Sequence, residues 1–309
     1  MLAMVYDGRF KALGCARQKS KGTEGARAGF QRIVETIRMA LKEAKVSPSQ
    51  LAGIGIAVPG PINPAKGLVI EMPNLGWHNF RLREMLRGVF KCHVSVLNDV
   101  DAGTYGEYRF GAGKGGHCVL GVFPGTGIGG GCVYKGDLLQ GATRSCMEIG
   151  HIRVQPDGPR CGCGGRGCLE ALASRLAISA AAAAAAYRGT APALLKDTGT
   201  SVKDIRSGDL AAAIRDGDTT VLDLVRDAAR WLGIAIGNVV NLINPDIVIL
   251  GGGLTTALPN IFLKGVRESC EESVMNPFRK TFKVVVATLG DEAACQGAAA
   301  WAMKSVVSG

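Results

Sequence analysis

A histidine and three cysteines form the group of side chains best suited to hold a metal. His151 is followed, after nine residues, by Cys161-x-Cys163-x4-Cys168. Three thiolates and one imidazole are a donor set typical of a closed tetrahedral zinc site. Because a closed site leaves no position for water, we expect this zinc to be structural, although three buried thiols beside an unrelated histidine are the alternative. The loop is rich in glycine, which lets a short chain wrap a small ion: Gly162, Gly164, Gly165 and Gly167.

Two carboxylates lie close to this loop in the chain. Glu148 precedes His151 by three residues and Glu170 follows Cys168 by two. Ionised carboxylates only accept hydrogen bonds, so they suit the hydroxyls of a polyol, and the second nitrogen of a zinc-bound imidazole also reaches a hydroxyl. Two carboxylates that are solvated or that cap helices explain the same residues equally well.

A third carboxylate, Asp99, follows Asn98 at the end of a short predicted strand, residues 93–97. Side chains at the carboxyl ends of strands in α/β folds lie where ligands bind. There Asp99 would accept a proton from a substrate hydroxyl and make that oxygen the nucleophile. Taken alone, the position favours an Asp that caps the following helix.

Two glycine runs follow predicted strands. The first run comes after strand 117–123 and leads into strand 130–134, so the strand–turn–helix context of a dinucleotide fingerprint is not met. We interpret it as a hairpin turn whose amides cradle a nucleotide tail, with a plain hairpin as the alternative. The second run, a triplet after strand 247–250, is placed to receive a nucleotide base. The runs are Gly125-Thr126-Gly127-Ile128-Gly129-Gly130-Gly131 and Gly251-Gly252-Gly253.

Helices and strands alternate along the chain, which predicts an α/β fold. Helical periodicity is plain in 24–45, where Phe30, Ile33 and Leu41 share one face. The predicted helices are 24–45, 99–110, 169–187, 221–241, 261–275 and 292–305. The predicted strands are 52–58, 93–97, 117–123, 130–134, 247–250 and 282–289. We predict a domain boundary in the glycine-rich stretch 108–116.

Composition narrows the class of protein. The 309 residues are 47% hydrophobic and carry a formal charge of +10, which suits a folded protein that attracts anionic small molecules. No Lys/Arg block, zipper or RNP-like run points to nucleic acid, and no apolar stretch has the length of a membrane span. The ten cysteines are mostly scattered and no signal peptide pattern is present, so we expect reduced thiols and a cytoplasmic location.

These motifs, in this order, resemble the ROK family (repressors, open reading frames and sugar kinases) of the actin-like ATPase superfamily. The resemblance covers nearly the whole chain. The segments that carry it are Leu97-Asn98-Asp99, Gly125–Gly131, Glu148-Ile149-Gly150-His151, the run from Cys161 to Glu170, and Asn244-Pro245-Asp246 leading to Leu250-Gly251-Gly252-Gly253.

The resemblance implies two actin-like (ribonuclease H-like) domains with a cleft between them. Residues 1–110 would form a small domain completed by helix 292–309, and 111–291 a large domain with the zinc loop at 151–170. Sugar and ATP would meet in the cleft, with Mg²⁺ on the phosphates.

The resemblance also implies residue roles. Asp99 would be the general base on the primary hydroxyl of a hexose, and Asn98 would bind a ring hydroxyl. Glu148, His151 and Glu170 would grip hydroxyls at the anomeric end, and Asn74 is a further candidate sugar contact. Gly125–Gly131 would form the second phosphate loop and Gly251–Gly253 would border the adenosine.

One departure from the family pattern concerns the first strand. Family enzymes begin with a strand that runs into Asp-x-Gly-Gly-Thr-Lys, the first phosphate loop, and this chain has no such segment. Residues 1–8 instead resemble the second strand and its turn. We therefore expect a chain of this form to be an impaired kinase, with an exposed strand edge in its first domain.

The substrate is predicted from the zinc loop. The Cys-x-Cys loop, with no histidine between Cys161 and Cys168, resembles glucokinase-type members and favours glucose, with an N-acetylhexosamine (N-acetylglucosamine or N-acetylmannosamine) as the alternative. A sugar-sensing transcriptional regulator of the same family is a second alternative. The resemblance suggests a homodimer or a dimer of dimers.

Overall fold

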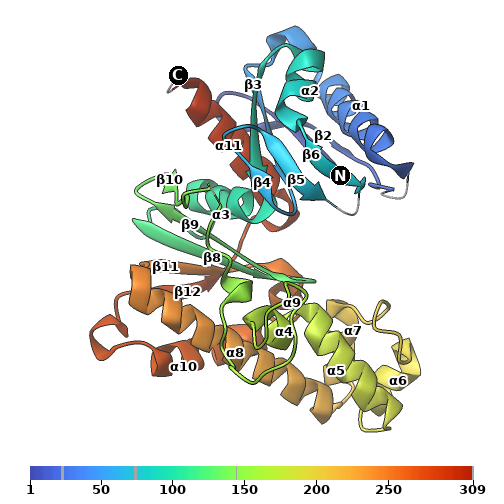
Figure 1. The fold of residues 1–309 in the computed structure, drawn as a ribbon, viewed down its shortest axis with the longest axis vertical. Coiled ribbons are helices and arrows are strands. Elements are labelled where there is room, and N and C mark those ends of the chain that lie inside the picture. The colour runs from blue at the N-terminus through green and yellow to red at the C-terminus, as the bar shows by residue number, and fades with distance from the viewer. Residues whose placement is uncertain (22–23, 73–74, 144, 308–309) are drawn as a thin grey trace. The chain divides into compact units, whose positions relative to one another are not determined.

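The computed structural model describes residues 1–21, 24–72, 75–143 and 145–307, and it is an α/β structure. The chain divides into two compact units. Unit 1 comprises Met1–Gly115, Asp137–Cys146 and Asp291–Gly309; unit 2 comprises Gly116–Gly136 and Met147–Gly290 (Figure 1).

The described residues of unit 1 form short sheets and four longer helices. Its strands are β1 (Leu2–Tyr6), β2 (Ala12–Arg17), β3 (Gly53–Val58), β4 (Ile62–Asn63), β5 (Leu68–Met72), β6 (Trp77–Phe80), β7 (His93–Asn98) and β10 (Asp137–Leu138). Its helices are α1 (Ala26–Ala44), α2 (Leu82–Phe90), α3 (Asp99–Phe110) and α11 (Ala293–Val307), with short 3₁₀ turns at Pro48–Gln50 and Gly290–Glu292. β1 pairs with β2, and β4, β5 and β6 pair in that order, all antiparallel; β3 and β7 pair in parallel.

Helix α1 confirms the prediction from periodicity. Phe30, Ile33, Val34 and Leu41 are buried on one face. The helix ends at Lys45, which adopts the left-handed conformation and donates its backbone N–H to carbonyls of the last turn. The strand β2 packs closely against α1 at Gly14, where a Cβ would lie 2.6 Å from the carbonyl oxygen of Ala40.

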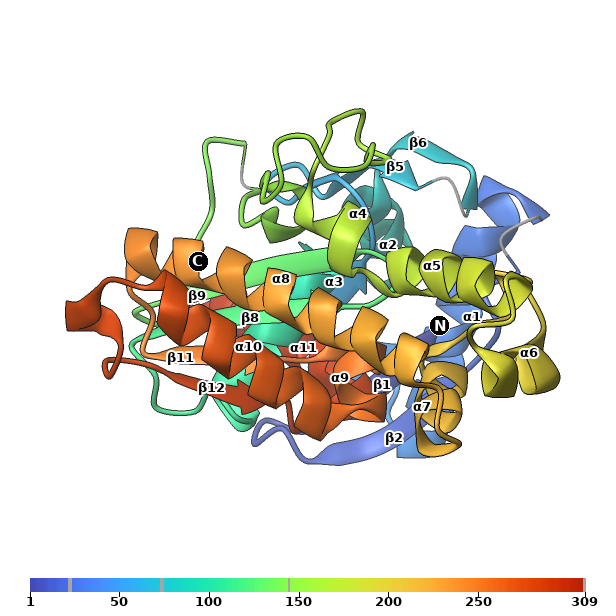
Figure 2. The same ribbon diagram turned by 90° about the horizontal axis from the view of Figure 1, so that it is seen from below.

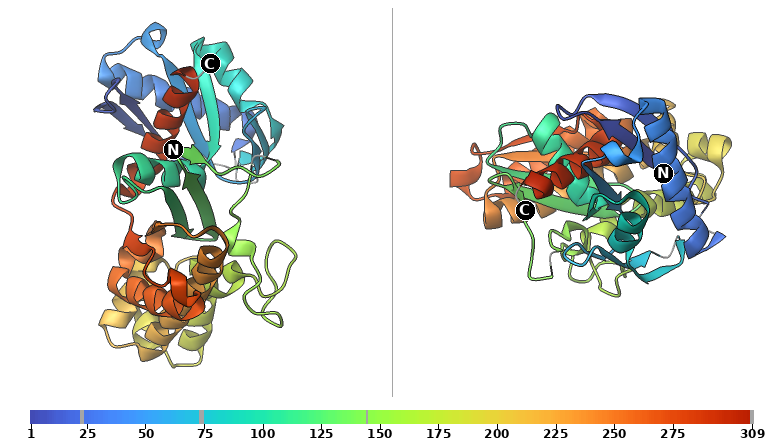
Figure 3. Two further views of the ribbon diagram at one scale, coloured as in Figure 1. Left: turned by 90° about the vertical axis from the view of Figure 1, so that its left-hand side faces the viewer. Right: turned by 90° about the horizontal axis from the view of Figure 1, so that it is seen from above.

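Helices α3 and α11 cross at glycines, which let the two backbones touch. A Cβ on Gly297 would lie 1.7 Å from the carbonyl oxygen of Ala102, and one on Gly106 would lie 2.2 Å from that of Ala293. Helix α11 also packs on β3, where a Cβ on Gly55 would lie 1.9 Å from the carbonyl oxygen of Ala298. The last helix of the chain therefore belongs to the same unit as the first strands (Figure 3).

Unit 2 combines a central sheet with a helical layer. Its strands are β8 (Cys118–Pro124), β9 (Ile128–Tyr134), β11 (Ile247–Leu250) and β12 (Lys283–Val286). Its helices are α4 (Leu169–Ala173), α5 (Arg175–Tyr187), α6 (Pro192–Thr198), α7 (Ser207–Arg215), α8 (Thr219–Ile243), α9 (Gly252–Ala257) and α10 (Pro259–Ser273), with 3₁₀ turns at Ile149–His151 and Asn276–Phe278.

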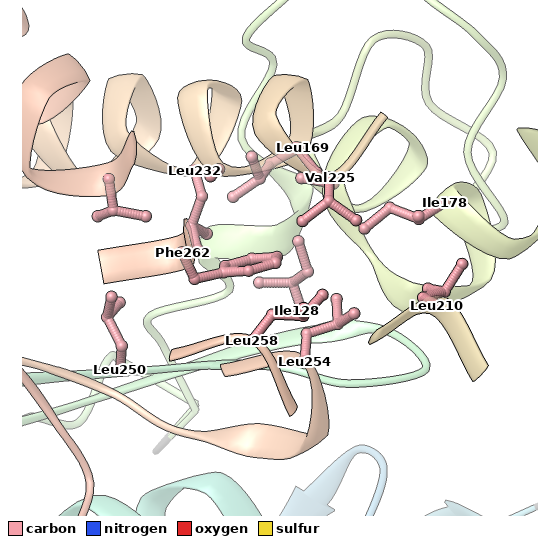
Figure 4. Packing of buried hydrophobic residues seen from close by; sticks show 14 of the residues in the cluster. Ile128, Leu169, Ile178, Leu210, Val225, Leu232, Leu250, Leu254, Leu258 and Phe262 are labelled. Atoms are coloured by element: carbon pink, nitrogen blue, oxygen red, sulfur yellow. The ribbon is translucent and has the colours of Figure 1, made fainter. Parts of the chain in front are cut away.

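The strands of unit 2 lie in one sheet in the order β9-β8-β11-β12, with β8 and β9 antiparallel and β8, β11 and β12 parallel. Helices α8 and α10 lie side by side against it (Figure 2). A cluster of apolar side chains fills the core between sheet and helices, and Figure 4 shows the ring of Phe262 among Leu232, Leu254, Leu258 and Ile128. This core fixes the ends of β8 and β11, from which the glycine runs emerge.

Three predicted elements need correction. The helix predicted over 169–187 is two helices, because Ser174 is extended and its Oγ accepts the backbone N–H of Ala177 as the N-cap of α5. The strand predicted to begin at 130 begins at Ile128, and the strand predicted over 282–289 is the shorter β12. In the described ranges, no helix combines the length and the apolarity that crossing a membrane requires.

Candidate functional site

The end of β7 places Asn98 and Asp99 at the start of α3. The cap of this helix is Asn98, whose Oδ1 accepts the backbone N–H of Val100 at 2.8 Å and of Asp101 at 3.4 Å. Asp99, the residue whose position favours a cap, is instead the first residue of the helix. The interpretation of Asp99 as the cap of α3 is therefore wrong.

The surroundings of Asp99 alter its acidity. Burial raises the pKa of this carboxyl above its ordinary value, and the hydrogen bond that Oδ1 accepts from Val100 N, 3.0 Å long, partly offsets the increase. A raised pKa makes the ionised carboxylate a stronger proton acceptor. The geometry thus suits a general base, and Asn98, which also donates through Nδ2 to the carbonyl oxygen of Gly60 at 3.4 Å, holds the strand end beside it.

The four predicted metal ligands come together in unit 2. Their ligand atoms all lie within 4.8 Å of one another. The sulfurs of Cys163 and Cys168 are 3.8 Å apart, and Cys161 Sγ lies 3.7 Å from His151 Nδ1. Usual zinc bond lengths give tetrahedral edges of about 3.8 Å between two sulfurs and about 3.6 Å between sulfur and nitrogen. The residues therefore fit a four-coordinate zinc ion.

Glycines shape the loop around this cluster. Gly167 has φ +71°, and a Cβ there would lie 1.6 Å from the carbonyl oxygen of Gln155. A Cβ on Gly165 would lie 3.2 Å from the sulfur of Cys168 and 3.4 Å from that of Cys163. Any larger residue at these positions would press on the sulfurs or on the facing backbone.

The two carboxylates beside the metal loop have different environments. Glu148 is exposed at the start of the 3₁₀ turn Ile149–His151, and its side chain makes no capping hydrogen bond. Glu170 is half-buried in the first turn of α4, and its Oε2 accepts the backbone N–H of Ile128 at 3.0 Å. Neither side chain caps a helix, so both stay candidates for binding hydroxyls.

The first glycine run is divided between a turn and a strand. Gly125–Gly127 form the turn, closed by a hydrogen bond from Gly125 N to Gly127 O of 2.8 Å, and Ile128 begins β9. Gly127 leaves room for the carboxylate of Glu170, whose Oε2 would lie 2.3 Å from a Cβ there. Gly130 is required by the 3₁₀ turn, since a Cβ there would lie 2.5 Å from the carbonyl oxygen of Met147. Part of the run thus serves packing.

The second glycine run lies at the neighbouring strand end. Because β8 and β11 are parallel, the turn after β8 and the triplet after β11 leave the same edge of the sheet. Gly252 has φ +81°, and a Cβ there would meet the carbonyl oxygen of Pro124 at 2.6 Å. A Cβ on Gly251 would lie 2.4 Å from the ring of Phe123, and one on Gly253 would lie 3.3 Å from Ser207 Oγ.

The sequence analysis missed one cation in this region. Arg175 donates through Nη2 to Thr126 Oγ1 at 2.8 Å, and its backbone N–H donates to Gly125 O at 2.9 Å. Because the sequence predicts one helix over 169–187, it places Arg175 inside a helix, and only the break at Ser174 brings this side chain to the start of α5. Asn74, the remaining predicted sugar contact, lies outside the described residues.

Comparison with known proteins places these motifs in context. The chain is 34% identical over 270 residues to the glucokinase of Streptomyces coelicolor, covering 86% of this chain and 84% of that protein. It is 36% identical over 272 residues to the glucokinase of Thermotoga maritima, covering 87% and 83%. The xylose repressor of Bacillus subtilis is 30% identical over 275 residues, with 89% of this chain and 66% of the repressor covered.

Solved structures agree with the sequence relatives. The structure of a ROK family glucokinase from Streptomyces griseus in complex with glucose and AMPPNP matches with a TM-score of 0.83 at 30% identity, covering 97% of this chain and 95% of that one. The family model named ROK family matches residues 4–305. The chain therefore belongs to the ROK family and has the two-domain fold of its sugar kinases.

Proposed function

We propose that this chain transfers the γ-phosphoryl group of ATP to the primary hydroxyl of a hexose, with glucose as the first candidate substrate and glucose 6-phosphate as the product. The observation that carries the proposal is the carboxylate of Asp99. It stands at the carboxyl end of β7, its pKa is raised by burial, and Asn98 has taken over the capping of α3. The similarity to glucokinases supports sugar phosphorylation as the reaction.

On this proposal Asp99 accepts the proton of the sugar hydroxyl while that oxygen attacks the phosphorus. Phosphoryl transfer needs little covalent chemistry from the protein, so alignment of the hydroxyl and stabilisation of charge supply the rate. Excluding water matters, since water is a competing acceptor.

The sugar would be held by residues of unit 2. Glu148 and Glu170 accept hydrogen bonds from hydroxyls, and the nitrogen of His151 that does not face the sulfurs contacts a further one. Cys161, Cys163, Cys168 and His151 would hold a zinc ion, which fixes the loop that carries these side chains. Asn98 and Asn74 stay proposed sugar contacts.

The nucleotide would lie at the shared edge of β8 and β11. The amides of the turn Gly125–Gly127 and the side chain of Arg175 would meet the phosphates, and Gly251–Gly253 would border the adenosine. Mg²⁺, bound with the nucleotide, would neutralise charge on the phosphate oxygens.

Larger features of the proposal follow from the family. We propose that units 1 and 2 are the two actin-like domains and that the protein forms a homodimer or a dimer of dimers. We also propose that it is an ATP-dependent kinase of the cytoplasm. The impaired activity expected for a chain without the first phosphate loop stays a prediction. Comparing its kcat with that of a form extended by this loop tests it, and equal activity contradicts it.

The substrate is tested by a coupled ATP-to-ADP assay with glucose, N-acetylglucosamine, N-acetylmannosamine, mannose and fructose, run on both forms. Glucose should give the highest kcat/KM. A preference for either N-acetylated sugar would replace glucose with the amino-sugar alternative, and turnover of none would remove the kinase assignment for this chain.

The similarity to a xylose repressor supports a second function, a sugar-sensing regulator without catalysis. If the protein is a regulator, calorimetry should detect sugar binding, and neither the given chain nor the form extended by the first phosphate loop should release ADP. Turnover with any hexose excludes that reading as the sole function.

A further inference from the structure

The turn that carries Glu148 begins with an unusual backbone conformation. Met147 has φ +61°, in the left-handed region, where a residue other than glycine is uncommon. Three other residues with this conformation are the C-caps of helices, where it is frequent: Lys45, Lys91 and Asn244. Met147 ends no helix, so its conformation has a different cause.

The residue after Met147 completes a tight turn. Met147 O accepts the backbone N–H of Ile149 at 2.7 Å, and Glu148 between them has φ −70° and ψ 57°. These angles are those of an inverse γ-turn, whose central residue lies at about −75° and +65°. Glu148 O in turn accepts the backbone N–H of His151 at 2.9 Å. The backbone is therefore fixed on both sides of the Glu148 side chain.

Strand β9 and the core of unit 2 hold this turn in place. A Cβ on Gly130 would lie 2.5 Å from Met147 O and 2.8 Å from Ile149 Cγ2. A Cβ on Gly150 would lie 2.2 Å from Ile128 O. Ile149 is 2% exposed, and Met147 packs, partly buried, against the same core. A strained backbone conformation persists only where the surrounding structure determines it, and these contacts do so.

Buried and exposed residues follow one another along the turn. Ile149 and Gly150 are buried, whereas Glu148 and His151, on either side of them, are exposed. The Glu148 side chain makes no capping hydrogen bond. Its direction is therefore set by the backbone of the turn, which the two buried residues anchor.

We propose that Met147 is a positioning residue, whose left-handed conformation starts the inverse γ-turn that directs the Glu148 carboxylate to the sugar. If the φ of residue 147 became negative, Met147 O would turn away from the backbone N–H of Ile149, and Glu148 would lose the turn that orients it. The backbone carries this role, and the thioether does not. The inference rests on the proposed function, because it requires Glu148 to bind a sugar hydroxyl.

The test changes the backbone preference and the side chain of residue 147 separately and measures the Kd for glucose by calorimetry. Met147→Ile keeps a large apolar side chain but disfavours the left-handed region, since its Cβ is branched. Met147→Gly and Met147→Asn remove that side chain and tolerate the region. The Kd should rise by about tenfold in Met147→Ile, the loss expected for a hydrogen bond to a charged group, and stay within about twofold in the other two variants.

The opposite results are equally clear. A rise in Kd of the same size in all three variants, or in none of them, overturns the proposal. A rise in Met147→Gly and Met147→Asn without one in Met147→Ile also overturns it, because the side chain would then matter and the backbone would not. Met85→Ile, the same substitution at an exposed position of α2, is the matched control and should leave the Kd unchanged.

A double-mutant cycle determines whether Met147 acts through Glu148. In a Glu148→Ala background the carboxylate is absent, so Met147→Ile should change the Kd for glucose by less than about twofold. Equal fold-changes in the two backgrounds would mean that Met147 affects the sugar by another route, and would contradict the proposal.

Two further measurements separate this inference from the zinc site and from the proposed function. Met147→Ile should keep about one zinc ion per chain, and loss of zinc together with sugar affinity would contradict a role specific to Glu148. If the parent chain binds no hexose, the proposed function fails, and this inference fails with it. If the parent binds glucose and Met147→Ile binds it equally well, this inference alone fails.

Discussion

Glu170 Oε2 accepts a hydrogen bond of 3.0 Å from the backbone N–H of Ile128, which ties the start of α4 to the start of β9. The same carboxylate oxygen lies over Gly127, where a Cβ would come within 2.3 Å of it. The metal loop leads into α4 and the glycine turn leads into β9. The Glu170 carboxylate therefore connects these two segments. A change on either side should therefore affect the binding of both proposed substrates.

Gly127→Ala should displace the carboxylate of Glu170. Because this side chain is proposed to bind the sugar and the turn is proposed to bind phosphate, KM should rise for both the hexose and ATP. Steady-state kinetics with each substrate varied in turn checks this. Gly88→Ala is the control, since a Cβ at that position in α2 meets nothing within 4 Å and alanine favours a helix. A rise in only one of the two KM values would contradict the connection through Glu170.

Arg175→Ala should weaken nucleotide binding selectively. Loss of a charge-assisted hydrogen bond to phosphate costs about 1.5 to 3 kcal/mol, so KM for ATP should rise by about tenfold or more while KM for the sugar stays within about twofold. Arg188→Ala, at the other end of α5 and exposed, is the matched control. An unchanged KM for ATP would mean that Arg175 only holds Thr126 in place.

Replacing Cys163 with serine should empty the metal site and weaken sugar binding. Without zinc, the loop that carries Glu148 and His151 is no longer held in place. The glycine triplet after β11 does not depend on the zinc ion. Metal analysis should show about one zinc per chain in the original protein and little in the variant. Cys15→Ser, an exposed thiol in β2, should keep its zinc. Full sugar affinity in a zinc-free variant would contradict the structural role of the ion.

The pH dependence of turnover should report the buried carboxyl. Asp99 must be ionised to accept a proton, and burial raises its pKa above the ordinary value. As pH falls, kcat/KM for the sugar should therefore decline at a higher pH than an ordinary carboxyl, near pH 4, would give. A profile that stays flat down to that range would contradict the assignment.

The sequence predicted elements whose signals are local. The periodic apolar face of α1 and the apolar strands β3, β7 and β11 were found within a few residues of their bounds. The strand β4 was missed because it has only two residues. The helix α2 was missed although Leu82, Leu86 and Phe90 recur at helical spacing on its buried face, because the helix is only nine residues long. The break at Ser174 was missed because the alanine-rich run on both sides of it favours a helix throughout.

The candidate site was predictable as far as it depends on residue type and spacing. The metal ligands are close in the chain, and their types are specific. The hydrogen bond between Glu170 and Ile128 joins residues 42 positions apart, so no local sequence pattern predicts it. At the start of α3, Asn98 is the N-cap and Asp99 is not. Asn and Asp are about equally favourable as N-caps, so the sequence does not show which of these two neighbours caps the helix.

The measurement that tests the account most directly is the turnover of Asp99→Asn, made in the form with the highest activity. Amide for carboxylate keeps the shape but removes the base, so kcat should fall by about a hundredfold or more while the Kd for sugar, by calorimetry, changes little. Asp101→Asn, in the same turn of α3, is the control. The variant should also be slightly more stable than the parent at neutral pH, because it no longer buries a charge. Near-full turnover in Asp99→Asn would contradict the central claim that this carboxylate activates the sugar hydroxyl.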